Sequence, residues 1–392
     1  KTPVYLDYNA TTPLDPRVLD AMMPYFTDRF GNAASRHHAL GCDAAQAVER
    51  ARAQVADLIG ADPREIVFTS GATESDNLAL KGVAESPVHH KRGRHIVTAA
   101  TEHKAVIDTC RHLETRGFEV TYLPVDADGR IDLQQLDDAV TDRTILVSLM
   151  HANNETGVLH PIRDIGALCR RHGVLFHTDA TQSVGKEPLH VEDDQIDLLS
   201  LSAHKMYGPK GVGALYVRRR RPRVRCEPLI HGGGHERGLR SGTLNVPAII
   251  GLGAAATIYR EDAFAESQRI RRLRDHLQAG LTGRIDGVTL NGDRARRLAG
   301  TLNLSFSDVH GEALMRAVPE IAVSSSSACT SAALQPSYVL GAMGRSDELI
   351  AASIRFSLGR FTTREEIDFT IDRVIAAVTR IRATAPARSE QP

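Results

Sequence analysis

Hydrophobic and polar positions alternate between helical and strand patterns from about residue 43 to residue 217. Residues 43–59 space their apolar side chains four, three, four and three positions apart, which places one apolar stripe on a helix that Gly60 ends. Short apolar runs rich in branched residues follow, and we expect strands at Ile66–Thr69, His95–Ala99, Val120–Leu123, Ile145–Met150, Val174–His177, Leu198–Leu201 and Ala214–Val217. Helical patterns separate most of these runs, near residues 73–84, 104–116, 132–140 and 162–172.

This order of elements predicts an α/β fold with a mostly parallel sheet covered by helices on both faces. A second, smaller α+β unit follows a helical pattern near residues 246–276. Its expected strands are Val288–Asn291, Ala299–Phe306, 321–324 and Ser353–Ser357, and its expected helices are 311–317, 347–352 and 364–382. In doubly covered parallel sheets, ligands bind at the carboxyl ends of the strands.

Composition adds few constraints. Of the 392 residues, 42% are hydrophobic and 24% are charged, as in an ordinary soluble globular protein. Lys plus Arg and Asp plus Glu both number 48, so no net charge draws the chain to nucleic acid or to a membrane. We expect no membrane span and no signal peptide, because no apolar run approaches the roughly 20 residues that a bilayer requires. The arginine run 218–221 is expected to be a solvated surface, with docking of an acidic partner as the alternative.

The five cysteines are scattered singly, with no CxxC pair. This pattern argues against a zinc site or a disulfide framework and favours a reducing, cytoplasmic location. Cys42, Cys110 and Cys169 lie on helical patterns, where we expect them to pack in the core. Cys329 differs, because the run Ser324–Ala332 consists of small, mainly hydroxyl residues that have little to bury. We therefore expect a reactive cysteine on a mobile loop.

Three motifs in chain order carry candidate chemistry. In the segment 68–77 a strand turns through Ser-Gly into a helix, and the free N–H groups there suit a phosphate, although a simple helix cap would look the same. Asp179 ends a buried strand, where it can pair with a protonated pyridine nitrogen or cap the next turn. Lys205, in the segment 200–211, lies at a strand end and can form a Schiff base with an aldehyde cofactor, or it can be an ordinary loop lysine.

Through these motifs, the chain resembles a cysteine desulfurase of the housekeeping bacterial type, the group that feeds iron–sulfur cluster assembly. Matching stretches run almost from end to end: residues 5–13, 68–77, 153–155, 176–182, 200–211, 231–236, 240–243, 327–331 and 355–360. The resemblance implies a fold-type I pyridoxal-phosphate enzyme and a homodimer with sites at the subunit interface. It also implies a large cofactor-binding domain over residues 15–260 and a small domain, formed by residues 1–14 and 261–392, that carries the Cys329 loop.

The resemblance further implies a role for each matching residue. Lys205 would hold pyridoxal 5'-phosphate and Asp179 would pair with its ring nitrogen. The phosphate would be held by Ala72, Thr73, Ser202 and His204, joined by Thr243 of the second subunit. Gln182 would reach the ring hydroxyl, and His103 would stack on the ring. Asn154 and Arg355 would bind the substrate carboxylate. L-Cysteine would yield L-alanine and a persulfide on Cys329.

Other functions remain open at this stage. A selenocysteine lyase or an aminotransferase could use the same fold, but neither needs a cysteine on a mobile loop. A non-catalytic scaffold would not need Lys205, Asp179 and Cys329 together. The sequence ends at Pro392 without the longer acidic and aromatic tail of the housekeeping enzymes. The sulfur acceptor is therefore not fixed by the sequence. It could belong to cluster assembly, tRNA thiolation, DNA backbone thiolation or a biosynthetic pathway.

Overall fold

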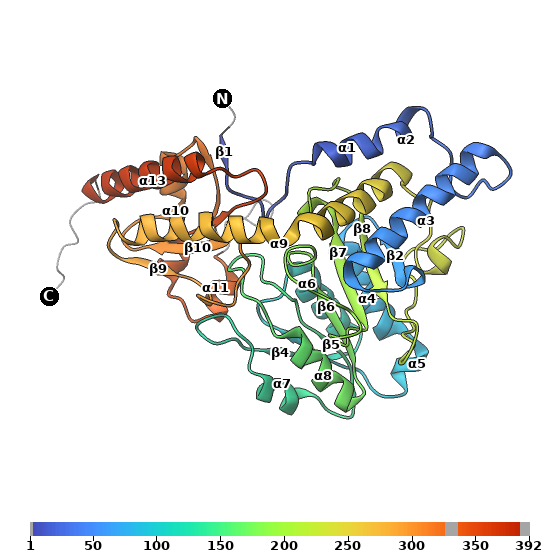
Figure 1. The fold of residues 1–392 in the computed structure, drawn as a ribbon. Helices are drawn as coiled ribbons and strands as arrows, with labels where there is room; N and C mark the ends of the chain where they lie inside the picture. The colour runs from blue at the N-terminus through green and yellow to red at the C-terminus, as the bar shows by residue number, and fades with distance from the viewer. Residues whose placement is uncertain (1–2, 326–335, 385–392) are drawn as a thin grey trace.

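The computed structural model describes residues 3–325 and 336–384 and contains a central seven-stranded sheet (Figure 1). Its strand order is β2 (Ile66–Thr69), β8 (Gly213–Val217), β7 (Leu198–Ser202), β6 (Leu175–Asp179), β5 (Thr144–Ser148), β3 (His95–Ala99) and β4 (Glu119–Leu123). Only β8 runs antiparallel to its neighbours in this sheet. The predicted, mostly parallel α/β sheet is therefore confirmed, and each predicted strand lies within two residues of its expected bounds.

Helices cover both faces of this sheet, because successive side chains of a strand point to opposite faces. In β2, Ile66 and Phe68 join one core while Val67 joins the other. The first core lies under α3 (Ala39–Ile59), α7 (Leu133–Ala139), α8 (Ile162–His172) and the start of α9 (Val246–Thr282). The second core lies under α4 (Ala72–Glu85) and α6 (Lys104–Thr115).

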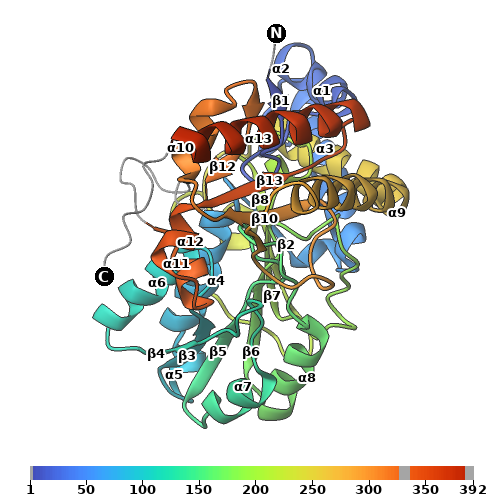
Figure 2. The ribbon, with the colours of Figure 1, turned by 90° about the vertical axis from the view of Figure 1, so that its left-hand side faces the viewer.

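A smaller antiparallel sheet lies at the other end of α9. Its strand order is β12 (Ser324–Ser325), β13 (Ser353–Ser357), β10 (Thr301–Phe306) and β9 (Val288–Leu290). A third core joins this sheet to α10 (Gly311–Ala317), to α13 (Arg364–Thr384) and to the last turns of α9. Figures 1 and 2 show α13 at the end of the molecule that lies away from α7 and α8.

The N-terminal segment crosses between the two sheets. Its short strand β1 (Val4–Tyr5) pairs in parallel with β11 (Ile321–Ala322), and Leu6 belongs to the core of the small sheet. Helix α9 also serves both cores, since its first half packs on the large sheet and its second half packs on the small one. The domain boundary expected after residue 260 falls within this helix, and the division into two domains stays a prediction.

Several short elements were not expected from the sequence: α1 (Pro16–Met22), α2 (Pro24–Thr27), α5 (Pro87–His90), α11 (Tyr338–Ala342) and β1. They are too short for a periodic pattern of apolar residues. Three of them begin with proline, whose fixed φ suits the first turn of a helix. The predicted helix 347–352 is present as α12 (Asp347–Ala351).

Two expectations about individual residues were wrong. Cys110 and Cys169 are buried, but Cys42 is exposed because it lies off the apolar stripe of α3 that includes Ala44 and Val48. Arg218 is not solvated, because it directly follows the buried strand β8. It pairs there with Asp197 at 3.1 Å and with Glu192 at 2.8 Å. Residues 219–221 of the same run are exposed as expected.

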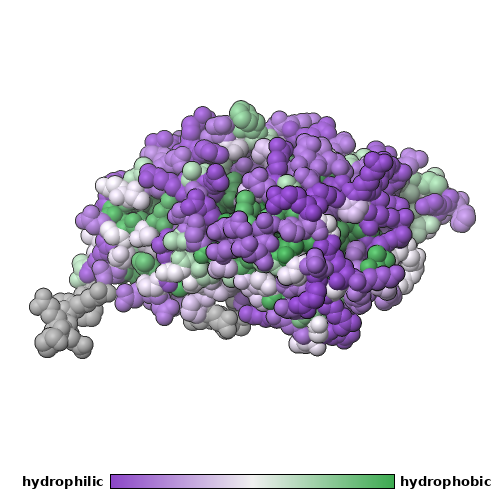
Figure 3. Space-filling view, turned by 90° about the horizontal axis from the view of Figure 1, so that it is seen from below, coloured by the Kyte–Doolittle hydropathy of each residue, from purple (hydrophilic) through white to green (hydrophobic). Residues whose placement is uncertain are grey.

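The outer surface drawn in Figure 3 is mainly polar, as expected for a chain whose apolar side chains fill the cores between the sheets and helices. The face drawn in Figure 3 is mostly hydrophilic, with hydrophobic side chains in smaller groups near its middle. Among the described helices, none combines the length and the apolar character that a membrane crossing requires.

One buried ion pair anchors α3 to the loop that follows the large sheet. Arg52 on α3 donates two hydrogen bonds to the Glu236 carboxylate, at 2.7 and 2.8 Å, and both side chains are at most 4% exposed. The Phe68 amide of β2 donates to the same carboxylate at 2.8 Å. Glu236 therefore joins a helix, a strand and a loop that are distant in sequence.

We predict that Glu236→Ala destabilises the protein by about 3–5 kcal/mol, because it removes the buried counter-ion of the Arg52 guanidinium. The midpoint of chemical denaturation measures this loss. Glu49→Ala is the matched control, since Glu49 also contacts Arg52 but is 62% exposed. The control should cost at most about 1 kcal/mol, and equal losses in the two variants would contradict the prediction.

Candidate active site

Most of the predicted site residues line one cavity of about 720 Å³. They are Ala72, Thr73, His103, Asn154, Asp179, Gln182, Ser202, His204, Lys205 and Arg355. Strands β2, β3, β5, β6 and β7 point in the same direction, so the segments that leave their carboxyl ends meet at one edge of the sheet. Residues that are distant in sequence, from Ala72 after β2 to Lys205 after β7, reach the cavity for this reason.

The turn between β2 and α4 forms an anion-binding cradle. Gly71 precedes α4 with a φ of 155°, a conformation that favours glycine, and it offers no side chain to cap the first amides. The amides of Ala72 and Thr73 therefore begin the helix at its positive end. Ser202 also lines this part of the cavity, 4.0 Å from the position that a Gly71 Cβ would take. This geometry suits a phosphate.

His204 adds a neutral imidazole to the cavity wall. Burial and the nearby lysines lower the pKa of His204 to about 4, so the ring is uncharged near neutral pH. Its Nδ1 atom lies 3.1 Å from the Thr11 hydroxyl, which leaves Nε2 for another hydrogen bond.

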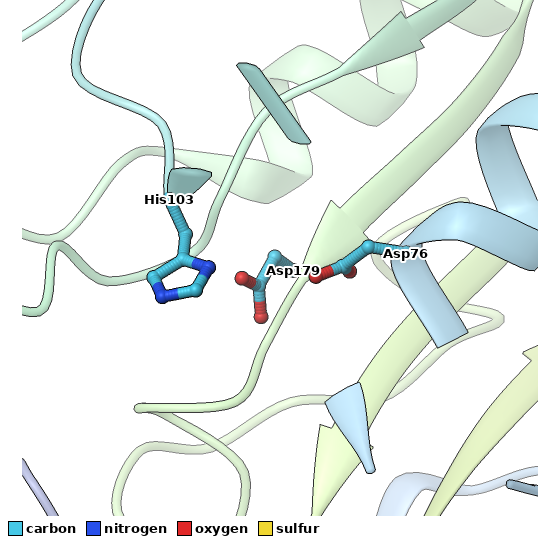
Figure 4. Close-up of side chains that lie close together, drawn as sticks. All are labelled: Asp76, His103 and Asp179. Carbon is cyan, nitrogen blue, oxygen red and sulfur yellow. The ribbon is translucent and has the colours of Figure 1, made fainter. Parts of the chain in front are cut away.

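Asp179 lies at the last position of β6 and is only 7% exposed. One of its carboxylate oxygens accepts a hydrogen bond from the Thr181 amide at 2.9 Å. Figure 4 shows the carboxylate between His103 and Asp76, and the three groups have atoms within 4.8 Å of one another. A carboxylate in this position suits a cationic ring nitrogen in the cavity.

His103 is the N-cap residue of α6, and its Nδ1 atom accepts a hydrogen bond from the Ala105 amide at 3.1 Å. The proton of the neutral ring therefore resides on Nε2. Burial is the largest cause that lowers the pKa of His103, while Asp179 acts in the opposite direction. The side chain can accept or release a proton where it borders the cavity.

Lys205 follows β7 directly, in a short 3-10 turn. Its ammonium group contacts the backbone oxygens of Asn9 and Ala10, the latter at 2.8 Å. The Asn9 oxygen also accepts a hydrogen bond from the Gln182 amide group at 2.9 Å. The N-terminal segment thus positions the lysine and the glutamine together.

Arg355 comes from β13 of the small sheet and is 2% exposed. It donates to the Asp7 carboxylate at 2.8 Å and to the Asn154 backbone oxygen at 2.9 Å. The Asn154 side-chain oxygen is buried and has no hydrogen-bond partner within the described chain. The guanidinium of Arg355 and the side-chain amide nitrogen of Asn154 are donors that suit a carboxylate ligand at the junction of the two sheets.

Two predicted residues lie elsewhere. Cys329 falls outside the described residues, although Ser324, at the near end of that gap, lines the cavity. Thr243 is exposed and does not line this cavity. Its contribution to the site of a second subunit stays a prediction.

Sequence reasoning gave no role to Asp7, Asn9, Asp76 or Lys186. Asp7 and Asn9 belong to a matching stretch, but the strand that places them, β1, has only two residues. Lys186 donates to Gln182 at 3.4 Å, and burial lowers the pKa of Lys186 to about 7. It lies in the turn 181–186, directly after Gly185, and no spacing of residues in that turn marks it as part of the site.

Comparison with known proteins agrees with this geometry. Residues 4–369 match the family described as aminotransferase class-V. The chain is 59% identical to a cysteine desulfurase, IscS, of Anaeromyxobacter sp. (strain Fw109-5), over 98% of this chain and 95% of the relative. The chain belongs to the cysteine desulfurase family.

Solved structures place the family on the same fold. A NifS-like protein superposes with a TM-score of 0.89 at 40% identity, covering 96% of this chain and all of the other. SspA in complex with cysteine superposes with a TM-score of 0.79 at 40% identity, covering 92% of this chain and 100% of the other. The predicted fold-type I architecture is therefore confirmed.

Pyridoxal phosphate is the cofactor of this family, and the cavity fits it. The cradle before α4 suits the phosphate, the Asp179 carboxylate suits the ring nitrogen, and Lys205 supplies an amine to the aldehyde. Three different chemical features of one molecule thus find matching groups in one cavity.

The loop that carries Asn154 also contains a buried acid, Glu155. Its carboxyl group accepts a hydrogen bond from the Ser337 hydroxyl at 2.5 Å. Burial raises the pKa of Glu155 to about 7, from an ordinary value of 4.5. The folded protein therefore keeps a proton that the unfolded chain releases, and the associated stability is lost as the pH rises from 4.5 to about 7.

We predict that this loss amounts to about 3 kcal/mol and that Glu155→Gln abolishes it. The free energy of unfolding of parent and variant, measured at several values between pH 4.5 and pH 8, tests the prediction. The parent should lose stability relative to the variant as the pH rises. A constant difference between the two proteins would show that Glu155 does not titrate in this range.

Proposed function

We propose that this chain takes sulfur from L-cysteine onto its own Cys329 and releases L-alanine. The observation that carries the proposal is the meeting of the phosphate cradle, Asp179, Lys205 and Arg355 in one cavity. The desulfurase relatives that match nearly the whole chain support the same reaction.

The cavity divides into parts that would hold different portions of the cofactor. The phosphate would accept hydrogen bonds from Ala72, Thr73, Ser202 and His204, with Thr243 of a second subunit completing the set. Asp179 would keep the ring nitrogen protonated, and Gln182 would donate to the ring hydroxyl. When bound, pyridoxal phosphate supplies an aldehyde that binds the substrate amine and a ring that accepts electrons from its Cα atom.

The substrate would be oriented by its carboxylate. Arg355 and Asn154 lie together on one side of the cavity and offer donors in fixed positions, because the Asp7 contact holds the guanidinium. This orientation would direct the Cα proton of cysteine toward Lys205. Lys205 would remove that proton, and His103, over the ring, would assist later proton transfers.

The sulfur step would use Cys329. Its thiolate attacks the sulfur of the substrate, so that an S–S bond forms while the bond between sulfur and Cβ breaks. The electron pair of the broken bond stays with the substrate carbon, which takes up a proton and leaves as alanine. One cysteine and one protein thiol thus give one alanine and one persulfide, with no outside oxidant or reductant.

The further setting of the reaction is also proposed. The homodimer would bring Thr243, which is exposed and lies outside the cavity of its own subunit, to the site of the second subunit. An acceptor protein, an iron–sulfur scaffold or another, would receive the sulfur from Cys329. A cytoplasmic location is supported by the free thiols of all four cysteines in the described part of the chain.

We predict that Lys205 binds the cofactor covalently. Borohydride reduction of the loaded protein, followed by peptide mapping, should place the pyridoxyl group on Lys205. Lys210 lines the same cavity and serves as the internal control. A label on Lys210 in the parent protein would contradict the assignment.

We also predict that Cys329→Ser lowers alanine and sulfide production from cysteine by roughly 100-fold or more, since a serine oxygen cannot accept sulfane sulfur. Mixing the variant with L-cysteine should still change the visible spectrum of the cofactor, because Lys205, Asp179 and His103 are intact. Cys42→Ser, at an exposed cysteine, is the matched control and should retain parental rates. Parental turnover by Cys329→Ser would show that sulfur leaves without a protein thiol, as in a lyase.

A further inference from the structure

Asp76 lies behind the cofactor cavity with an unusual lack of polar contacts. It is on the first turns of α4, one turn beyond the phosphate cradle, and is 1% exposed. Neither of its carboxyl oxygens makes a hydrogen bond of normal geometry within the described chain, although the Ser200 hydroxyl is a nearby donor that favours the charged form. Burial outweighs this contact and raises the pKa of Asp76, so the neutral, protonated acid is the favoured form.

Among the residues that the structure describes, the groups around Asp76 supply no positive charge. His177 Nε2 lies 3.6 Å from Asp76, but its two ring nitrogens already contact the hydroxyls of Ser148 and Ser200, at 2.8 and 3.0 Å. Burial lowers the pKa of His177 to about 4, so this histidine is neutral. Glu102 faces the same space, and burial raises its pKa as well.

The other neighbour is Asp179, whose carboxylate lies within 4.8 Å of the Asp76 carboxyl group (Figure 4). Two buried carboxyl groups at this distance hold a single negative charge, as in other acidic pairs. Asp179 borders the cavity and accepts a hydrogen bond from the Thr181 amide, and both features favour its ionised form. Asp76 neither borders the cavity nor accepts a backbone hydrogen bond. The charge therefore resides on Asp179.

We propose that Asp76 is a positioning residue that stays protonated and keeps the negative charge of this buried pair on Asp179. The neutral carboxyl group presents its polar end to Asp179 without competing for the cationic ring of the cofactor. This inference rests on the proposed pairing of Asp179 with the ring nitrogen, and it assigns a role to a residue behind that pair.

The protonation state can be tested on the cofactor-free protein. Infrared spectra of protein labelled with ¹³C-aspartate distinguish its protonated carboxyl groups from those of glutamate. At neutral pH, the parent should show a protonated aspartic acid band that Asp76→Asn removes. A spectrum unchanged by that substitution would overturn the proposal.

The positioning role can be tested by cofactor affinity, with pyridoxal phosphate titrated into the cofactor-free parent, Asp76→Asn and Asp76→Leu. Asparagine is neutral and polar, so its apparent Kd should stay within about threefold of the parent, whereas leucine should weaken binding about tenfold or more. Equal weakening by both substitutions would mean that an ionised Asp76 is required, and parental affinity of the leucine variant would mean that Asp76 has no role. Either result overturns the proposal.

Two controls keep these outcomes separate. Glu187→Gln changes another largely buried acid, outside the cavity, and should leave the affinity for pyridoxal phosphate unaltered. Circular dichroism shows whether the leucine variant folds. If the leucine variant does not fold, the affinity of the asparagine variant and the infrared band still test the proposal. A parent that fails to bind pyridoxal phosphate would instead refute the proposed function, without affecting the infrared result.

Discussion

The buried guanidinium of Arg355 joins the two sheets of this protein, and the candidate site depends on that contact. Arg355 comes from β13 of the small sheet, Asp7 from the N-terminal segment and Asn154 from the loop after β5. A buried arginine requires hydrogen bonds at several of its donors, so these three segments can meet in few arrangements. The contact places a carboxylate-binding group opposite the carboxyl edge of the large sheet.

Burial also controls which groups of the site carry charge. The histidines His151, His160 and His177 lie behind the cavity wall, and burial lowers the pKa of each to about 4. Buried acids such as Glu102 have raised pKa values. These buried histidines and acids thus add little charge behind the cavity near neutral pH, and their burial strengthens the attraction between Asp179 and a cationic ring. A neutral Asp76 continues this arrangement directly behind the reactive groups.

The sequence indicated much of the large sheet and most of the candidate site. Its strands form short, nearly continuous apolar runs that are buried on both faces, and such runs are visible in sequence because burial leaves little room for polar residues. The phosphate, ring and lysine motifs were found because polar side chains stand at or just after the ends of these runs, as Asp179 ends β6 and Lys205 comes three residues after β7. The roles of the other site residues were implied by the resemblance to cysteine desulfurases. β1, α1 and α2 were missed, since two to seven residues hold few apolar positions, although the equally short α10 and α12 were predicted.

By itself, then, the sequence determined the layered α/β fold and the order of the phosphate, ring and lysine motifs along the chain. Only the tertiary structure decided which neighbours each group has. It placed Asp76 beside Asp179, set the Asn9 backbone oxygen against both Lys205 and Gln182, and buried Arg218 while Cys42 remained exposed. Such contacts join residues from different elements. The burial that they create sets the pKa values, and so the charges, of the titratable side chains in the site. Local patterns of residues carry no record of that burial.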